Sequence, residues 1–124
     1  MKAMIETYKE LIVWQKGIIL VTKIYAFTAS FPKEEMYSLS SQMRRAAVSI
    51  PSNIAEGRSR SSRKDFVQFL RISHGSLAEL ETQLIVSEEL KYGNGMLRKE
   101  IFVLINEEKK MLISMISKLK SPSA

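Results

Sequence analysis

The sequence predicts an all-α protein, an antiparallel up-down-up-down four-helix bundle that spans residues 1–124 as a single domain. Apolar side chains recur at alternating spacings of three and four in four successive segments, and this period marks one face of an α-helix. Only five Gly and three Pro interrupt the chain, and the connections between the segments are short. Short connections make each helix antiparallel to its predecessor, so the up-down-up-down order follows.

The first helix is expected over about residues 8–30. Its predicted core face consists of Leu11, Trp14, Ile18, Val21 and Tyr25. Phe31-Pro32 ends the helix, because proline disfavours helical geometry in the residue before it. Six more apolar residues lie outside this face, namely Ile12, Val13, Ile19, Leu20, Ile24 and Phe27. A bundle helix that is apolar nearly all round indicates contact with another subunit, so we expect self-association.

The second helix is expected over about residues 34–57. Glu34 and Glu35 stand at its start, where the helix dipole favours negative charge, and Gly57 is its expected C-terminal stop. Pro51 lies inside the pattern and removes the hydrogen bond to the Ala47 carbonyl, so a kink is expected there. The predicted core face consists of Met36, Leu39, Met43, Ala46 or Ala47, Ile50 and Ile54.

The third helix is expected over about residues 62–92 and the fourth over about residues 95–119. Ser62 and Asp65 have the spacing of a capping box, and Gly93-Asn94-Gly95 predicts a turn between the two helices. The third core face consists of Phe66, Leu70, Ser73, Leu77, Leu80, Leu84 and Ser87. The fourth consists of Leu97, Ile101, Leu104, Ile105, Met111, Leu112, Met115, Ile116 and Leu119. Ser121–Ala124 is expected to be a frayed tail.

The positive charge of the chain is local. The formal net charge is +6 and the isoelectric point is near 9.7. Residues 33–64 hold seven Lys and Arg against three Asp and Glu, whereas residues 65–92 hold two against five. This distribution favours an anionic partner, with nucleic acid first and an acidic protein or membrane surface after it.

Several classes of protein are disfavoured. The chain has no cysteine, which excludes disulfides and thiolate zinc sites and permits a reducing compartment. Met1–Glu10 lacks the features of a signal peptide, so a cytoplasmic location is expected. Leu11–Phe31 is the most apolar stretch, but Gln15, Lys16 and Lys23 interrupt it, so we expect no membrane span.

Enzymatic chemistry has almost no support in the sequence. His74 is the only histidine, and Arg71 stands three residues before it, where a di-metal bundle would carry Glu. The carboxylates Glu79, Glu81, Glu88 and Glu89 are expected to form a solvated face. The glycines lack the spacing of a nucleotide-binding loop. We therefore expect a non-enzymatic protein without cofactor or metal, and an enzyme that uses the bundle interior is the least favoured alternative.

Six cations are the candidate nucleic-acid contacts: Arg44, Arg45, Arg58, Arg60, Arg63 and Lys64. The last four lie before or at the start of the third helix, where free N–H groups and the guanidinium fork suit phosphate. The same serine-rich string is equally typical of a solvated loop with helix caps. No aromatic residue is interleaved with these cations, so we expect recognition of the RNA or DNA backbone without base stacking.

The chain resembles a known family through several motifs: Leu11–Lys16, Phe31-Pro32, Gln42–Ile50, Ser52–Gly57, Ser61–Phe69 and Gly75–Glu81. These segments resemble the four-helix bundles encoded by intervening sequences of bacterial large-subunit (23S) ribosomal RNA genes. That family is similar to the accessory variability protein of diversity-generating retroelements. The resemblance implies a basic homopentamer that binds nucleic acid through its surface and associates with a reverse transcriptase.

Two functions remain open from the sequence. The first is a basic oligomer that binds the RNA or DNA backbone with little sequence specificity. The alternative is an oligomeric adaptor whose basic surface docks a protein partner, a nucleic-acid enzyme such as a reverse transcriptase.

Overall fold

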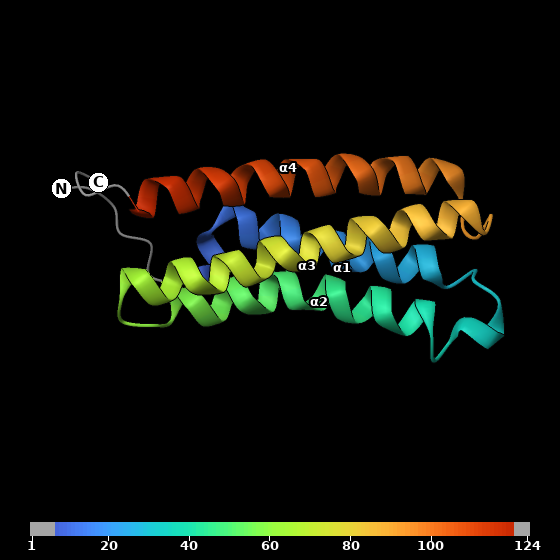
Figure 1. Ribbon diagram of the computed structural model, residues 1–124, viewed down its shortest axis with the longest axis horizontal. Helices are drawn as coiled ribbons and strands as arrows, with labels where there is room; N and C mark the ends of the chain where they lie inside the picture. The colour runs from blue at the N-terminus through green and yellow to red at the C-terminus, as the bar shows by residue number, and fades with distance from the viewer. Residues whose placement is uncertain (1–6, 121–124) are drawn as a thin grey trace.

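A computed structural model describes residues 7–120 of the chain. This part contains four α-helices, two short 3-10 turns and no strand. The helices are α1 (Ile12–Thr28), α2 (Leu39–Arg58), α3 (Arg63–Glu89) and α4 (Gly95–Lys120), and the turns are η1 (Tyr8–Glu10) and η2 (Lys33–Glu35). The helices lie side by side with alternating direction, which confirms the predicted bundle (Figure 1). The expected frayed tail, Ser121–Ala124, lies outside the described residues.

The four helices form a ring in which each one packs against two neighbours. The contacting pairs are α1 with α2, α2 with α3, α3 with α4, and α4 with α1. Fully buried side chains from all four helices, such as Leu20, Met43, Leu77 and Ile105, fill the centre. In such a ring the outer face made by α1 and α2 lies opposite the face made by α3 and α4. None of the described helices combines the length and apolarity needed to cross a membrane.

The first two helices begin later than the sequence predicts. α1 begins at Ile12 because the Oγ1 of Thr7 accepts the N–H of Lys9, which caps the separate turn η1, and Leu11 is extended. α2 begins at Leu39, whose N–H donates to Oε1 of Glu35 at 3.2 Å. Glu35 therefore stabilises the start of the helix, as expected. The helix itself begins about one turn later in the chain than predicted.

The buried face of α1 also differs from the predicted one. Four residues expected outside the core face are at most 1% exposed: Val13, Leu20, Ile24 and Phe27. Ile18 and Tyr25, from the predicted core face, are 39% and 44% exposed. Leu11, Trp14 and Val21 of the predicted face are partly buried against the core, so the prediction was wrong only in part. Apolar residues surround α1, so periodicity could not choose the fully buried face. Gly17 orients the helix, since a Cβ there would lie 3.3 Å from both Pro51 Cβ and Glu108 Oε2.

Small residues bring α2 and α3 close together. A Cβ on Gly57 would lie 2.6 Å from Cβ of Phe69, so only glycine fits there without a shift. The Ser73 hydroxyl donates to the Ile50 carbonyl at 2.8 Å, and a hydrogen bond of 2.8 Å joins the hydroxyls of Ser49 and Ser76. Gly57 lies inside α2, which continues through Pro51 to Arg58, so its assignment as the helix stop was wrong.

The predicted start and end of α3 are largely confirmed. The Ser62 hydroxyl accepts the N–H of Asp65 at 3.0 Å, as one half of the expected capping box. The helix ends at Glu89, before the expected residue 92. Gly93 forms the predicted turn with φ +82°, and a Cβ there would lie 2.4 Å from the Phe27 ring. The side chain of Asn94 accepts the N–H of Leu97 and caps α4.

Ion pairs connect α4 with both of its neighbours. Lys16 and Lys23 of α1 pair with Glu107 and Glu100 at 3.1 Å, and Lys109 pairs with Glu81 of α3 at 3.0 Å. Each partly exposed pair contributes about 0–1 kcal/mol. The attachment of α4 therefore depends chiefly on its buried residues, which are Ile101, Ile105, Glu108 and Leu112.

The contact at Gly57 gives a direct test of the packing. Gly57→Ala should lower the free energy of unfolding by about 1–3 kcal/mol, because the added methyl overpacks the α2–α3 contact. Gly75→Ala is the control, since a Cβ there meets nothing within 4 Å. This change should raise the free energy of unfolding by roughly 0.5–1 kcal/mol. Urea denaturation followed by circular dichroism measures both, and equal effects would contradict the close approach.

Candidate functional site

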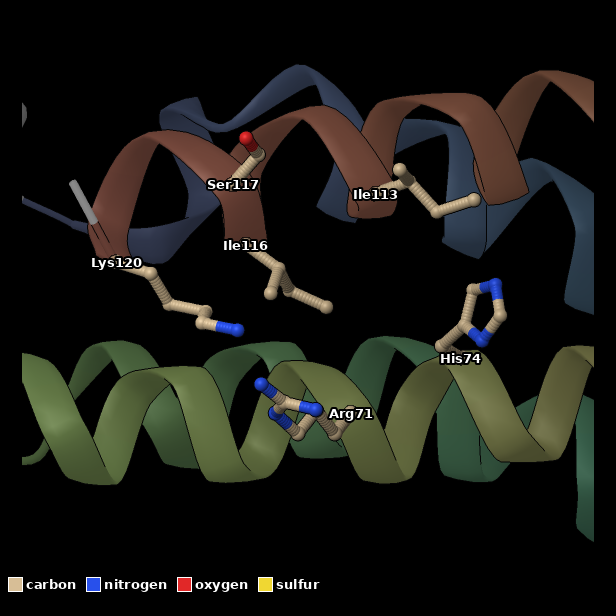
Figure 2. A pocket seen from close by; sticks show the side chains of 6 residues that line it. All are labelled: Arg71, His74, Ile113, Ile116, Ser117 and Lys120. Atoms are coloured by element: carbon tan, nitrogen blue, oxygen red, sulfur yellow. The ribbon is translucent and has the colours of Figure 1, made fainter.

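A basic groove runs between the first turns of α3 and the last turns of α4. Its outer part is lined by Arg63, Lys64, Val67, Gln68, Arg71, Leu119 and Lys120. Arg71 and Lys120 also line an adjoining pocket with His74, Ile113, Ile116 and Ser117 (Figure 2). We call the two parts together the α3–α4 groove. The antiparallel helices bring these segments to the same end of the bundle, although they are far apart in the sequence (Figure 1).

The cations of the α3–α4 groove are not neutralised. Arg63, Lys64, Arg71 and Lys120 are all exposed, and no ion pair joins them to another described residue. No carboxylate of a described residue lines either part of the groove. Unpaired charges of one sign between two low-dielectric walls produce a focused positive potential. The groove can therefore attract an anion without first breaking an internal contact.

Only two of the six predicted contact residues lie in this groove, Arg63 and Lys64. Arg60 instead donates to Oε2 of Glu56 at 2.6 Å, and its guanidinium lies 4.9 Å from the centroid of the Phe69 ring. Arg58 is half-buried and is not free. The string from Gly57 to Lys64 thus divides into two cations held by the protein and two that face solvent.

Arg44 and Arg45 lie on the opposite face of the bundle. They line a depression between α1 and α2 together with Tyr25 and Tyr37. Nε of Arg44 donates to Oγ1 of Thr28 at 2.8 Å, and its guanidinium lies 4.6 Å from the centroid of the Tyr25 ring. No aromatic residue is interleaved with these cations in the sequence, but the fold brings the ring of Tyr25 to Arg44 from another helix. The six predicted residues therefore do not form one surface.

Arg71 and Lys120 were not among the residues predicted from the sequence to contact nucleic acid. Arg71 lies two turns after Lys64, so helical periodicity could have added it to the predicted cluster. Lys120 has no such signal, because its position beside Arg71 arises only from the packing of α4 on α3. The periodicity of one helix does not predict which residues of another helix lie beside it.

The described residues contain no group of three or more His, Cys, Asp or Glu that could hold a metal ion. His74 is half-buried on the flank of α3 that faces α4, and its Nε2 is buried without a hydrogen-bond partner among the described residues (Figure 2). The chemistry that the groove offers is therefore binding of anions by cationic and neutral donors.

A second titratable group is enclosed in the bundle. Glu108 is fully buried, and neither carboxyl oxygen has a hydrogen-bond partner among the described residues. Burial raises the pKa of the Glu108 carboxyl to about 8, although Lys16 acts to lower it, and Glu107 raises it further. The carboxyl is thus mostly protonated at neutral pH. Glu108 was not predicted from the sequence as a core residue, but it fills the core position between Ile105 and Leu112.

Comparisons with known proteins agree with this fold. The family model of the 23S rRNA-intervening sequence proteins matches residues 9–114. The chain belongs to this family. Among solved structures it is similar to a protein of unknown function from the S23 ribosomal protein family of Bacteroides thetaiotaomicron VPI-5482. The two share 28% sequence identity with a TM-score of 0.76, over 85% of this chain and 98% of that chain. No curated protein matches this 23S rRNA-intervening sequence protein.

The buried carboxyl of this family member predicts a specific pH dependence. The folded state keeps a proton on Glu108 up to about pH 8, whereas the unfolded chain loses it near pH 4.5. The contribution of this raised pKa to the free energy of unfolding is therefore complete below about pH 4.5. It is lost as the pH rises through about 8.

Glu108→Gln, which has no proton to lose, should remove this contribution. Relative to the variant, wild type should lose stability in urea as the pH rises from 4.5 to 9. Glu89→Gln, at an exposed position at the end of α3, is the control and should keep the wild-type profile. Parallel profiles for wild type and Glu108→Gln would contradict the assignment.

Proposed function

We propose that this protein is a non-enzymatic, basic oligomer that binds the phosphate backbone of RNA or DNA with little sequence specificity. The observation that carries the proposal is the α3–α4 groove, in which four cations face solvent without an ion pair among the described residues. Because no carboxylate among the described residues lines it, this part of the groove repels no part of a polyphosphate chain.

The chemistry of the groove suits phosphate. Two arginines offer planar pairs of donors that match phosphate oxygens, and two lysines add point charges. Contacts of this kind fix the nucleic acid in place without reading its sequence. Neutralising phosphates also releases counterions, so binding should weaken steeply with salt.

The face of the bundle made by α1 and α2, opposite the α3–α4 groove, is suited to self-association. An apolar depression between α1 and α2 is lined by Trp14, Ile18, Val21, Val48 and neighbouring side chains. Ile18 and Val48 are 39% and 40% exposed. Contiguous exposed apolar surface of this kind is typical of a protein interface. In a ring of five the depression contacts a different face of the next copy, and the proposal requires that face to exclude the α3–α4 groove. The resemblance to the accessory variability protein implies five subunits, and the cytoplasm is the proposed location.

The proposal assigns backbone contact to the groove rather than to Arg44 and Arg45. Val48 lines both the apolar depression and the depression that holds these two arginines, so the two surfaces are continuous. In the oligomer, Arg44 and Arg45 would therefore lie at or beside the contact between copies.

The first prediction from this proposed function concerns binding to the nucleic-acid backbone. Arg63→Glu/Lys64→Glu should weaken binding to duplex DNA and to structured RNA, because it reverses two free cations. Fluorescence anisotropy over a salt series measures this, with a log-log slope of roughly 0.9 per phosphate neutralised on B-DNA. The slope should fall by about one for each phosphate that the variant no longer neutralises.

Lys91→Glu/Lys99→Glu is the matched control, with the same charge change at the other end of the bundle. Equal weakening by the two variants would contradict the groove as the site. A wild-type protein that does not bind at low salt would instead favour the adaptor function, in which the groove docks an acidic protein partner.

The second prediction concerns self-association. Ile18→Glu inserts a charge into the apolar depression of α1 and α2 and should reduce the subunit number. Light scattering should give about five times the subunit mass of 14.2 kDa for wild type and a lower value for the variant. Ile85→Glu, at a 47% exposed position on α3, is the control. An unchanged mass for Ile18→Glu would contradict the interface.

A further inference from the structure

The inner end of the α3–α4 groove differs in character from its cationic outer end. This inner pocket, of about 530 Å³, is lined by Arg71, His74, Ile113, Ile116, Ser117 and Lys120. Figure 2 shows Arg71 and Lys120 reaching into the space between the helices from opposite sides, with His74 and Ile113 further along. Apolar side chains, one imidazole ring and two cations therefore share one pocket.

His74 is the unusual member of the inner pocket. Its ring lies on the side of α3 that faces α4, and its Nε2 is buried without a hydrogen-bond partner among the described residues. Ile113, across the pocket, is 55% exposed, which is high for a large apolar side chain beside a half-buried ring.

We infer that the inner pocket holds an unpaired base of single-stranded RNA or DNA, while Arg71 and Lys120 bind the phosphates that flank it. The inference rests on the proposed function and adds the class of nucleic acid. Bases in single strands stack on aromatic side chains, His among them, and expose their edges to hydrogen bonding. Here the imidazole and the isoleucines contact the face of the base, and the Ser117 hydroxyl, which lines the same pocket, bonds to its edge.

A paired base cannot reach this pocket. In a duplex each base is stacked on both faces and must leave the stack before a protein pocket can enclose it. The inner pocket lies between two helices in direct contact, and packed helices have axes only about 8–10 Å apart. A duplex can therefore touch the outer cations Arg63 and Lys64, whereas an unpaired strand can also fill the inner pocket.

The composition of the pocket favours nucleic acid over an acidic peptide. An acidic segment would satisfy the two cations, but it would leave the flat imidazole ring without a matching group. A base offers both a planar face and hydrogen-bonding edges. Ser117 adds a further hydroxyl at the same pocket.

The test compares single-stranded oligothymidylate with duplex DNA of the same length on the full chain. His74→Ala and Ile113→Ala should each weaken binding to the single strand by about five- to a hundredfold, the range expected when one stacking partner is removed. Binding to the duplex should stay unchanged. Ile72→Ala, which truncates a 44% exposed isoleucine of α3 outside the pocket, is the matched control.

A second readout does not depend on stability. An oligothymidylate with one 5-iodouracil should photocrosslink to His74 or to a residue next to it in the pocket, as mapped by mass spectrometry. His74→Phe keeps a stacking ring and should retain more of the single-strand affinity than His74→Ala.

Each outcome decides the inference. Equal weakening on single strand and duplex, no weakening on either, or crosslinks confined to other faces would overturn it, as would an oligoglutamate peptide that binds more tightly than oligothymidylate. If Arg63→Glu/Lys64→Glu still weakens duplex binding in those cases, the proposed function stands without the base pocket. If wild type binds neither nucleic acid, both proposals are wrong.

Discussion

The close contact between α2 and α3 is the constraint on which the rest of the structure depends. It is possible because Gly57 has no Cβ, so Phe69 can lie where a side chain would otherwise stand. Serine hydroxyls on both helices satisfy one another or a backbone carbonyl at the same interface. A glycine without a side chain and hydroxyls with hydrogen-bond partners let the two helices approach closely without burying unpaired donors.

The position of the cationic site follows from that contact. Gly57 is near the end of α2, and it contacts the first turns of α3 through Phe66 and Phe69. Those same turns carry Arg63, Lys64 and Arg71 on the flank that faces α4. The packing of one side of α3 against α2 thus determines which side of α3 faces α4. The helix α4 forms the second wall of the α3–α4 groove and contributes Lys120.

Glu108 shows a different kind of constraint. Its carboxyl fits in the core because Gly17 leaves room on α1, and a Cβ on Gly17 would lie 3.3 Å from its Oε2. A single polar group in an apolar core can fix the register between helices, at a cost in stability. Protonation reduces that cost, since a neutral carboxyl is far cheaper to bury than a carboxylate. Gly17 and Glu108 therefore specify how α4 aligns with α1.

The sequence predicted the fold class, the number of helices and the turn at Gly93, because long periodic segments and glycine turns are local signals. It did not predict the buried face of α1, since apolar residues surround that helix and the close contact of Gly17 with Pro51 depends on how the helices pack. Within the site, the free cations Arg63 and Lys64 were predicted. The pairing of Arg60 with Glu56, the ring beneath Arg44 and the presence of Lys120 depend on side-chain geometry and on contacts between helices, which periodicity does not encode.

Lysine footprinting in the presence and absence of nucleic acid tests the central claim most directly. The full chain is acetylated with and without a saturating oligonucleotide, and the modification of each lysine is measured by mass spectrometry. If the α3–α4 groove is the binding site, Lys64 and Lys120 become protected while Lys91 and Lys99, at the other end of the bundle, react as before. Uniform protection of all four, or none at Lys64 and Lys120, would contradict the account.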